Sequence, residues 1–224
     1  MKGLINRTKI VATIGPASSS EEMLKKIIQN GVNVCRLNFS HGSHQDHKDV
    51  IERIRRVDEI LGTHTAILGD LQGPKIRIGE VENNHIELAD GHEFTITTEE
   101  CVGNLDRVYL TYKTFPKDVQ AGEMILIDDG KLQLRVLNTD GEKDVRVKVI
   151  HGGPLSSKKG VNLPNTKISL PCLTEKDEKD LQFALEHEIH WIGLSFVRSP
   201  QDIRELREII KMAGKDCRII AKIE

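Results

Sequence analysis

The chain has 224 residues, 38% of them hydrophobic, and a formal net charge of −2. This length suits one or two domains with real cores, and the near-neutral charge argues against a nucleic-acid-binding protein. The sequence shows no apolar run long enough to span a membrane, no signal-peptide pattern and no paired cysteine motif, so we expect a cytoplasmic protein with reduced cysteines and no membrane association.

The first 70 residues alternate strands and helices. Strands are predicted over residues 9–14 and 65–69, on either side of a strand that begins at Val32. The first helix begins with capping-box spacing from Ser18 to Glu21 and stops at Gly31. The second helix stops at Gly62, and its apolar stripe comprises Val50, Ile51, Ile54, Val57 and Leu61. A strand between two amphipathic helices predicts a series of parallel strands.

The strand after Val32 separates two kinds of side chain with a period of two. The apolar set is Cys35, Leu37 and Phe39, and the polar set is Arg36, Asn38 and Ser40. If helices cover the apolar face, the polar side chains project at the carboxyl end of the strand, where parallel α/β proteins keep their active sites. A half-solvated antiparallel strand is the alternative, and the flanking helices disfavour it.

Helical spacing disappears from about Glu80 to Lys167. Strands are predicted at 93–97, 107–111, 123–127, 131–136 and 144–150, and Asp-Gly turns at 90–91, 129–130 and 140–141. We interpret this region as an all-β domain inserted into the β/α series after its third strand. Because the insert follows the carboxyl end of a β/α strand, we expect a lid that moves on two hinges. An insertion without function is the alternative.

The β/α alternation resumes at Thr174, which caps a helix. A strand over 191–196, a helix opened by Ser199-Pro200 and a fifth strand over 218–223 follow. The expected domains are a first barrel part over residues 1–79, the insert over 80–167 and a second barrel part over 168–224. The barrel parts hold about 136 residues, whereas an eight-fold β/α barrel commonly takes about 250. Either the sheet is open, or the chain is part of something longer.

A series of motifs resembles, in order, the amino-terminal part of the pyruvate kinases. The motifs are KIVATIGP at 9–16, RLNFSHG at 36–42, GPKIR at 73–77, DDG at 128–130, SKKGVNLP at 157–164, LSF at 194–196 and KIE at 222–224. The resemblance implies an α/β fold, namely a partial (β/α)8 TIM barrel with an inserted all-β barrel domain after strand 3. It also implies phosphoryl transfer from phosphoenolpyruvate to ADP in glycolysis, by an enzyme that forms a homo-tetramer at full length.

The resemblance assigns catalysis to Lys222 and Arg36, and phosphoenolpyruvate binding to these two residues with Ser195. A guanidinium offers a planar fork that matches a phosphate group. Glu224 would be a ligand of the divalent cation, and oxygen ligands suit Mg²⁺ or Mn²⁺. Without the resemblance, a lysine and a glutamate two residues apart on a strand more often form a structural ion pair.

Nucleotide binding is assigned by the same resemblance. It implies that Asn38, His41, Arg77 and Lys159 contact ADP or ATP, with Asp129 reaching down from the lid. Alone, a lysine pair such as Lys158-Lys159 would be an ordinary solvated turn. His44 and His47 have metal-like spacing on a helix, but nothing else in the sequence points to them, and we expect both on exposed faces.

The resemblance further implies a monovalent-cation site made by Asn38, Ser40, Asp70 and the backbone carbonyl of Leu71. The sequence departs here from the pattern of the potassium-dependent enzymes, because Lys75 stands where those enzymes carry glutamate. Gln72 and Ile78 also match the potassium-independent branch. We therefore expect the Lys75 ammonium to replace K⁺; a lysine that points into solvent is the alternative.

Two other functions remain open at this point. One is another Mg²⁺-dependent, enolate-forming barrel enzyme of the aldolase type, which the long β insert disfavours. The other is a non-catalytic barrel remnant. By resemblance the chain lacks three barrel strands and a regulatory domain, so we expect an inactive fragment that self-associates through the open edges of its sheet.

Overall fold

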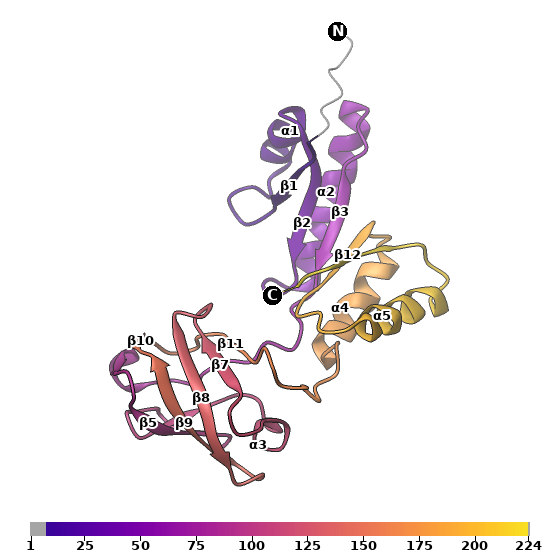
Figure 1. Ribbon diagram of the computed structural model, residues 1–224. Coiled ribbons are helices and arrows are strands. Elements are labelled where there is room, and N and C mark those ends of the chain that lie inside the picture. Colours follow the sequence, from indigo (N-terminus) through magenta and orange to yellow (C-terminus); the bar gives the residue numbers. More distant parts are fainter. Residues whose placement is uncertain (1–7, 224) are drawn as a thin grey trace. The chain divides into compact units, whose positions relative to one another are not determined.

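The computed structural model describes residues 8–223, which divide into two compact units (Figure 1). The first unit contains the residues up to Pro74 and those from Pro171 onward, and the second runs from Lys75 to Leu170. Residues distant in sequence therefore share the first unit, and each unit has a hydrophobic core of its own. Within residues 8–223, none of the helices has the length and apolar character needed to cross a membrane.

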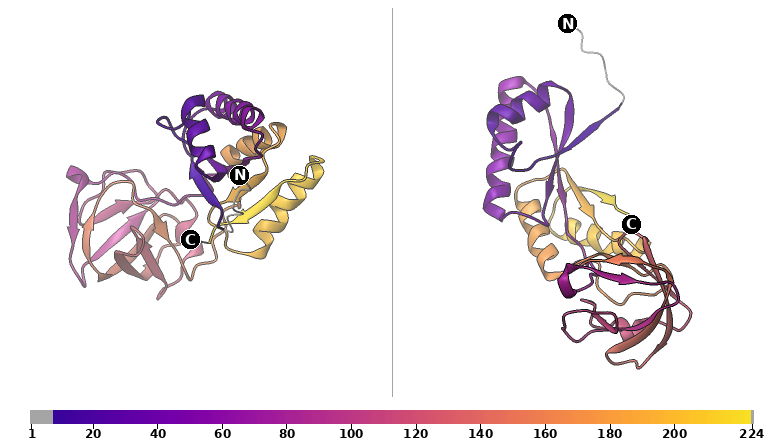
Figure 2. Two further views of the ribbon diagram at one scale, coloured as in Figure 1. Left: turned by 90° about the horizontal axis from the view of Figure 1, so that it is seen from above. Right: turned by 90° about the vertical axis from the view of Figure 1, so that its left-hand side faces the viewer.

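The first unit is a mixed α/β structure around a curled, parallel sheet. Its strands lie side by side in chain order: β1 (Ile10–Thr13), β2 (Val32–Asn38), β3 (Ala66–Asp70), β12 (Trp191–Leu194) and β13 (Arg218–Ala221). The helices are α1 (Glu21–Gln29), α2 (His44–Leu61), α4 (Glu175–Glu186) and α5 (Pro200–Met212). They lie along one side of the curled sheet (Figure 2). Because the strands are parallel, their carboxyl ends share one edge of the sheet.

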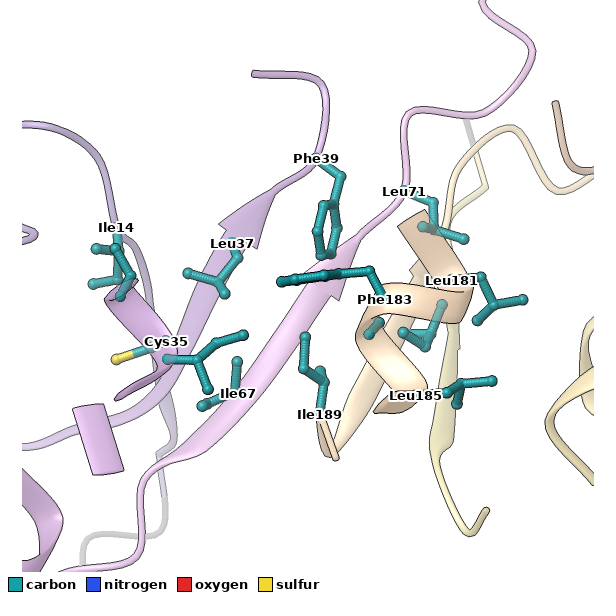
Figure 3. Close-up of a cluster of buried hydrophobic side chains, with 14 of the residues drawn as sticks. Ile14, Cys35, Leu37, Phe39, Ile67, Leu71, Leu181, Phe183, Leu185 and Ile189 are labelled. Carbon is teal, nitrogen blue, oxygen red and sulfur yellow. The ribbon is translucent and has the colours of Figure 1, made fainter. Parts of the chain in front are cut away.

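The core of this unit lies between the sheet and its helices. The predicted apolar face of β2 is confirmed, since Cys35, Leu37 and Phe39 are all at most 1% exposed. Figure 3 shows Phe39 and Phe183 of α4 close together, and their ring centroids are 6.0 Å apart. Gly69 makes room for this ring, because a Cβ at Gly69 would lie 2.6 Å from Phe39 Cε2. Burial of the apolar stripe of each helix is the main force that holds the layers together.

The helix ends follow the predicted signals with one exception. Gly62 ends α2 in the left-handed conformation at φ 64°, and Thr174 and Ser199 cap α4 and α5. The predicted cap of α1 at Ser18 is wrong, because Ser20 is the N-cap and accepts from the Met23 backbone N–H. Three successive serines can all cap, but Ser18 Oγ accepts instead from the Gly15 N–H at 3.0 Å, in the turn before the helix.

The last two strands are shorter than predicted. β12 ends at Leu194 because Phe196 turns the chain at φ 56°, and β13 ends at Ala221. Backbone pairing nevertheless continues past the strand ends. The Lys222 N–H donates to the Leu194 carbonyl at 3.0 Å, and the Lys222 carbonyl accepts from the Val197 N–H at 3.0 Å. The backbone of Lys222 is thus fixed at the carboxyl edge of the sheet.

The second unit is almost entirely β structure. Its six-stranded sheet has the order β11 (Val161–Asn162), β7 (Met124–Ile127), β8 (Leu132–Thr139), β9 (Asp144–His151), β5 (Glu93–Thr97) and β6 (Arg107–Tyr109), and β10 (Gly153–Leu155) pairs with β4 (Ile86–Leu88). The three predicted Asp-Gly turns are present, with left-handed Gly91, Gly130 and Gly141. The sequence reading missed two short helices, the 3₁₀ turn Glu82–Asn84 and α3 (Phe115–Asp118), because one turn is too short to show a helical period.

A short segment at the start of this unit joins the two edges of the sheet. On one side the Ile78 N–H donates to the Lys159 carbonyl at 2.9 Å, and the Ile76 carbonyl accepts from Val161 at 3.0 Å. On the other side the Gly79 N–H donates to the Tyr109 carbonyl at 2.8 Å, and the Arg77 carbonyl accepts from Thr111 at 2.9 Å. Residues 76–79 thus connect β11 to β6 with backbone hydrogen bonds.

Candidate functional site

A buried carboxylate at the end of β3 pairs with two cationic side chains, one from the adjacent strand β2 and one that directly follows β13, two strands away. Asp70 is 3% exposed. Its Oδ2 accepts from Arg36 Nε at 2.7 Å, and its Oδ1 accepts from Lys222 Nζ at 3.0 Å. The three residues come from the carboxyl ends of β2, β3 and β13, as the parallel sheet requires. Such charge-assisted hydrogen bonds fix the orientation of both cationic groups.

Ser195, directly after β12, links the lysine to the backbone of Leu71, directly after β3. Lys222 Nζ donates to Ser195 Oγ at 2.8 Å, and Ser195 Oγ donates to the Leu71 carbonyl at 2.6 Å. Ser195 itself is only 3% exposed. Gly193 allows the strands to approach, since a Cβ there would lie 2.9 Å from Asp70 Oδ1. The Lys222 ammonium therefore lies among fixed oxygen atoms that define its direction.

Within residues 8–223, the cluster contains two cationic side chains and one carboxylate. Among the described residues, both cationic side chains pair with the Asp70 carboxylate, and the side chains of Arg36 and Lys222 are 29% and 34% exposed. Arg36 also donates from Nη1 to Thr13 Oγ1 at 2.8 Å. A guanidinium and an ammonium at the carboxyl edge of the sheet attract anions, so this arrangement can hold a phosphate or carboxylate group.

Two other predicted residues of the first unit, Asn38 and His41, lie at the end of β2 and in the loop that follows it. Asn38 pairs with Asp70 across β2 and β3. The Asn38 Oδ1 atom accepts from the Ser40 backbone N–H at 3.1 Å, so it fixes the start of the loop after β2. His41 is exposed in this loop, and its carbonyl accepts from His47 Nε2 at 2.9 Å. Of the predicted monovalent-cation ligands, the side-chain oxygen of Asn38, the Asp70 carboxylate and the Leu71 carbonyl each already accept from protein donors.

The predicted residues of the second unit lie on two adjoining segments. Lys159 Nζ donates to Asp128 Oδ1 at 3.0 Å, and Arg77 Nη1 donates to the Lys158 carbonyl at 2.6 Å. Hydrogen bonds from Lys131 and Lys159 lower the pKa of Asp128. Asp129 is exposed in a strained turn where Asp128 and Asp129 have φ 53° and 57°. Lys75, the first residue of this unit, is also exposed.

The remaining predictions concern Glu224 as a metal ligand and the exposure of His44 and His47. Glu224, the predicted divalent-cation ligand, lies outside the described residues, and residues 8–223 contain no group of three or more histidine, cysteine or acidic side chains that could hold a metal ion. The expectation that His47 is exposed is wrong, because its position on the buried stripe of α2 leaves it 9% exposed. Burial lowers its pKa. The side chain of His44 is 45% exposed and pairs with Asp180.

Sequence reasoning missed a second buried carboxylate beside the loop after β2. The Asp180 side chain is 4% exposed and accepts from Lys176 Nζ at 2.6 Å, and its other oxygen lies 2.7 Å from His44 Nε2. One signal was available in the sequence. Asp180 occupies the same face of α4 as Asp177, Leu181 and Ala184, so an ionisable residue interrupts a stripe that must be buried.

Comparison with known proteins identifies the family of the chain. The family model described as "Pyruvate kinase, barrel domain" matches residues 5–224. Curated proteins named "Pyruvate kinase" from Staphylococcus aureus strains USA300 and NCTC 8325 are 44% identical over 221 residues, which cover 98% of this chain and 38% of the relatives' own length. The chain thus spans well under half of the relatives that it matches. A family match over nearly all of the chain, together with this identity, shows that the chain belongs to the pyruvate kinase family.

Proposed function

We propose that this chain carries phosphoenolpyruvate-binding and phosphoryl-transfer residues of a pyruvate kinase, an enzyme of glycolysis that makes pyruvate and ATP from phosphoenolpyruvate and ADP. The observation that carries the proposal is the cluster of Arg36, Asp70 and Lys222 at the carboxyl ends of parallel strands. Family membership supports the interpretation of this cluster as part of the site that binds phosphoenolpyruvate. In relatives of full length we expect these residues to work within a homo-oligomer.

The proposal includes the fold as a whole. The five-stranded sheet would be part of a (β/α)8 barrel, with barrel segments over residues 1–79 and 168–224. Residues 80–167 would be an inserted β-barrel lid on two hinges. Support comes from the strict chain order of the parallel strands and from the separate core of the second unit.

Arg36 and Lys222 would bind and stabilise the phosphoryl group that is transferred. Negative charge spreads over the equatorial oxygens of that group in the transition state, so fixed cationic groups are effective there. Asp70 holds both side chains ready while no anion is bound, and an incoming phosphate would compete with it for their hydrogen bonds. Ser195 would complete the phosphoenolpyruvate pocket, and its bond to Lys222 supports this placement.

Nucleotide and divalent cation complete the proposed site. Asn38, His41, Arg77 and Lys159 would contact the nucleotide, with Asp129 contributed by the lid. Glu224 would supply a carboxylate to Mg²⁺ or Mn²⁺, a hard cation suited to oxygen ligands. When bound, the divalent cation neutralises charge on the phosphate groups. The Lys159–Asp128 pair indicates that Lys159 is already oriented by a carboxylate.

We also propose that the enzyme works without added K⁺, with Lys75 as the replacement cation. The oxygens of Asn38, Asp70 and Leu71 support independence from K⁺, because they already accept from the Ser40 backbone N–H, the Lys222 ammonium and the Ser195 hydroxyl, respectively. The placement of Lys75 beside that set is part of the proposal.

A chimera tests the proposed function. Residues 1–224 would be joined to the remaining carboxyl-terminal part of the Staphylococcus aureus relative, and turnover of phosphoenolpyruvate and ADP would be followed in a coupled assay beside the intact relative. We expect activity, and a fall of at least about a hundredfold for Lys222→Met and for Arg36→Gln, the scale of losing one fixed donor to transition-state charge. A folded chimera without turnover, or one indifferent to both substitutions, would reject the proposal.

A further inference from the structure

The loop from Phe39 to Ser43, between β2 and α2, has backbone carbonyls that are held by side chains from two helices. Lys176 of α4 donates from Nζ to the Phe39 carbonyl at 2.6 Å. His47 of α2 donates from Nε2 to the His41 carbonyl at 2.9 Å. These contacts fix the backbone on both sides of Ser40, while the side chain of His41 remains exposed.

Asp180 connects these two helices at a single buried carboxylate. Oδ2 accepts from Lys176 at 2.6 Å, and Oδ1 lies 2.7 Å from Nε2 of His44, the first residue of α2. The side chain of Asp180 is 4% exposed, whereas those of Lys176 and His44 are 49% and 45% exposed. A buried carboxylate is costly unless its oxygens are bonded, so both partners are held close to it.

Ring packing adds a second restraint to the same loop. The His44 ring stacks on Phe183 at a centroid distance of 4.6 Å and an interplanar angle of 14°. Phe39 meets the His47 ring at 4.7 Å, and Figure 3 shows Phe39 approaching Phe183 from the end of β2. The rings fix the flanks of the loop, and the Lys176–Asp180 pair fixes its first carbonyl.

We propose that Asp180, acting through Lys176, is a positioning residue that holds the Phe39–Ser43 loop so that His41 can meet the nucleotide. The inference rests on the proposed function for the role of His41, whereas the clamp on the loop stands on the contacts alone. Asp180 and Lys176 touch neither substrate. They act by restricting a loop that would otherwise sample several conformations.

Amide hydrogen exchange of the 224-residue chain tests the clamp. Lys176→Met and Asp180→Asn should each speed exchange in residues 40–43 by about tenfold, as expected when a local opening becomes easier. Lys176→Arg keeps a donor for the Phe39 carbonyl and should restore slow exchange. Asp202→Asn is the matched control, because Asp202 is also a buried aspartate on a helix of this unit, α5, and the substitution should leave the loop unchanged.

Unchanged exchange in residues 40–43 of Lys176→Met would overturn the clamp. Since the side chain of Lys176 is half exposed, this variant can be made even if Asp180→Asn fails to fold. In the active chimera, Lys176→Met should raise the KM for ADP by about tenfold, a factor typical of a lost positioning contact, with the KM for phosphoenolpyruvate unchanged and Lys176→Arg close to wild type. A loosened loop with an unchanged KM for ADP would overturn the positioning role. A chimera without turnover would count against the proposed function, and the exchange measurement would still decide the clamp.

Discussion

Replacing Asp70 with asparagine should destabilise the first unit and, at the same time, strengthen its binding of anions. Asp70 is the shared partner of Arg36 and Lys222, so the substitution removes the carboxylate that pairs with both of these cations. Removing one partner of a buried pair commonly costs about 3–5 kcal/mol. Here the cationic side chains are 29% and 34% exposed, and water can solvate them in part, so we expect a loss of about 2 kcal/mol.

The anion effect follows from the same geometry. Removing a like charge about 4 Å from a bound phosphate is worth between about 1 kcal/mol in water and about 4 kcal/mol near a protein surface. Phosphate should therefore bind the Asp70→Asn variant at least about fivefold more tightly than wild type, which corresponds to the lower value of about 1 kcal/mol. Added phosphate should also restore part of the lost stability, because it binds the folded state.

Urea unfolding followed by tryptophan fluorescence measures both effects. Trp191 is the single tryptophan of the chain and lies in β12, so its signal reports on the first unit. Asp49→Asn is the control, because the contacts of Asp49 are exposed ones on the surface of α2, a pair with Arg53 at 4.0 Å and a hydrogen bond from Gln45 Nε2 at 2.7 Å. It should change stability by less than about 0.5 kcal/mol. The reasoning fails if Asp70→Asn matches this control, or if phosphate stabilises the variant no more than wild type.

Further predictions concern a cation, a histidine and two thiols. In the active chimera, Lys75→Glu should create a K⁺ requirement. The proposed role of Lys75 would be contradicted if K⁺ at constant ionic strength raised the rate of the unsubstituted chimera by about tenfold or more, which corresponds to a barrier lowered by about 1.4 kcal/mol. Burial lowers the pKa of His47 below its ordinary 6.5, so below about pH 6.5 the unfolded chain binds a proton that the folded site resists. Wild type should then lose stability relative to His47→Gln as the pH falls from about 7.5 to about 5.5, and parallel losses in urea titrations would refute this. Burial raises the pKa of the Cys35 thiol to about 12, so limited iodoacetamide treatment should label the partly exposed Cys101 first, and early labelling of Cys35 in peptide mass spectra would show that the core opens readily.

Local patterns predicted the elements well where a single physical signal dominates. The α2 stripe and Gly62 define that helix, because burial and the left-handed cap agree on its end. Signals that compete locally were harder to interpret. Ser18 and Ser20 can both cap α1, and the turn at Phe196 ends β12 through a backbone conformation that an aromatic residue rarely adopts.

The candidate site shows the same limit at longer range. Arg36 and Lys222 were predicted because their residue types suit phosphate, and the parallel sheet brings both strand ends to one edge. The sequence could not show that Asp70 pairs with both of them, since that depends on the register of strands far apart in the chain. Asp180 was missed for a related reason. Its partner His44 is 136 residues away, and only the packing of α4 against the loop after β2 brings them together.

The backbone hydrogen bonds of residues 76–79, which connect β11 to β6 in the second unit, also bear on the order in which the chain can fold. Leu68 of β3 pairs with Trp191 of β12, so folding must close the long loop of chain between these two residues. Most of that segment lies between Arg77 and Gly160, which already pair with each other inside the second unit. If that unit folds first, the effective loop becomes roughly threefold shorter, which lowers the entropic cost of closing it by about 1 kcal/mol. β3 and β12 would then pair while the second unit between them in sequence is already folded, rather than across a long disordered chain.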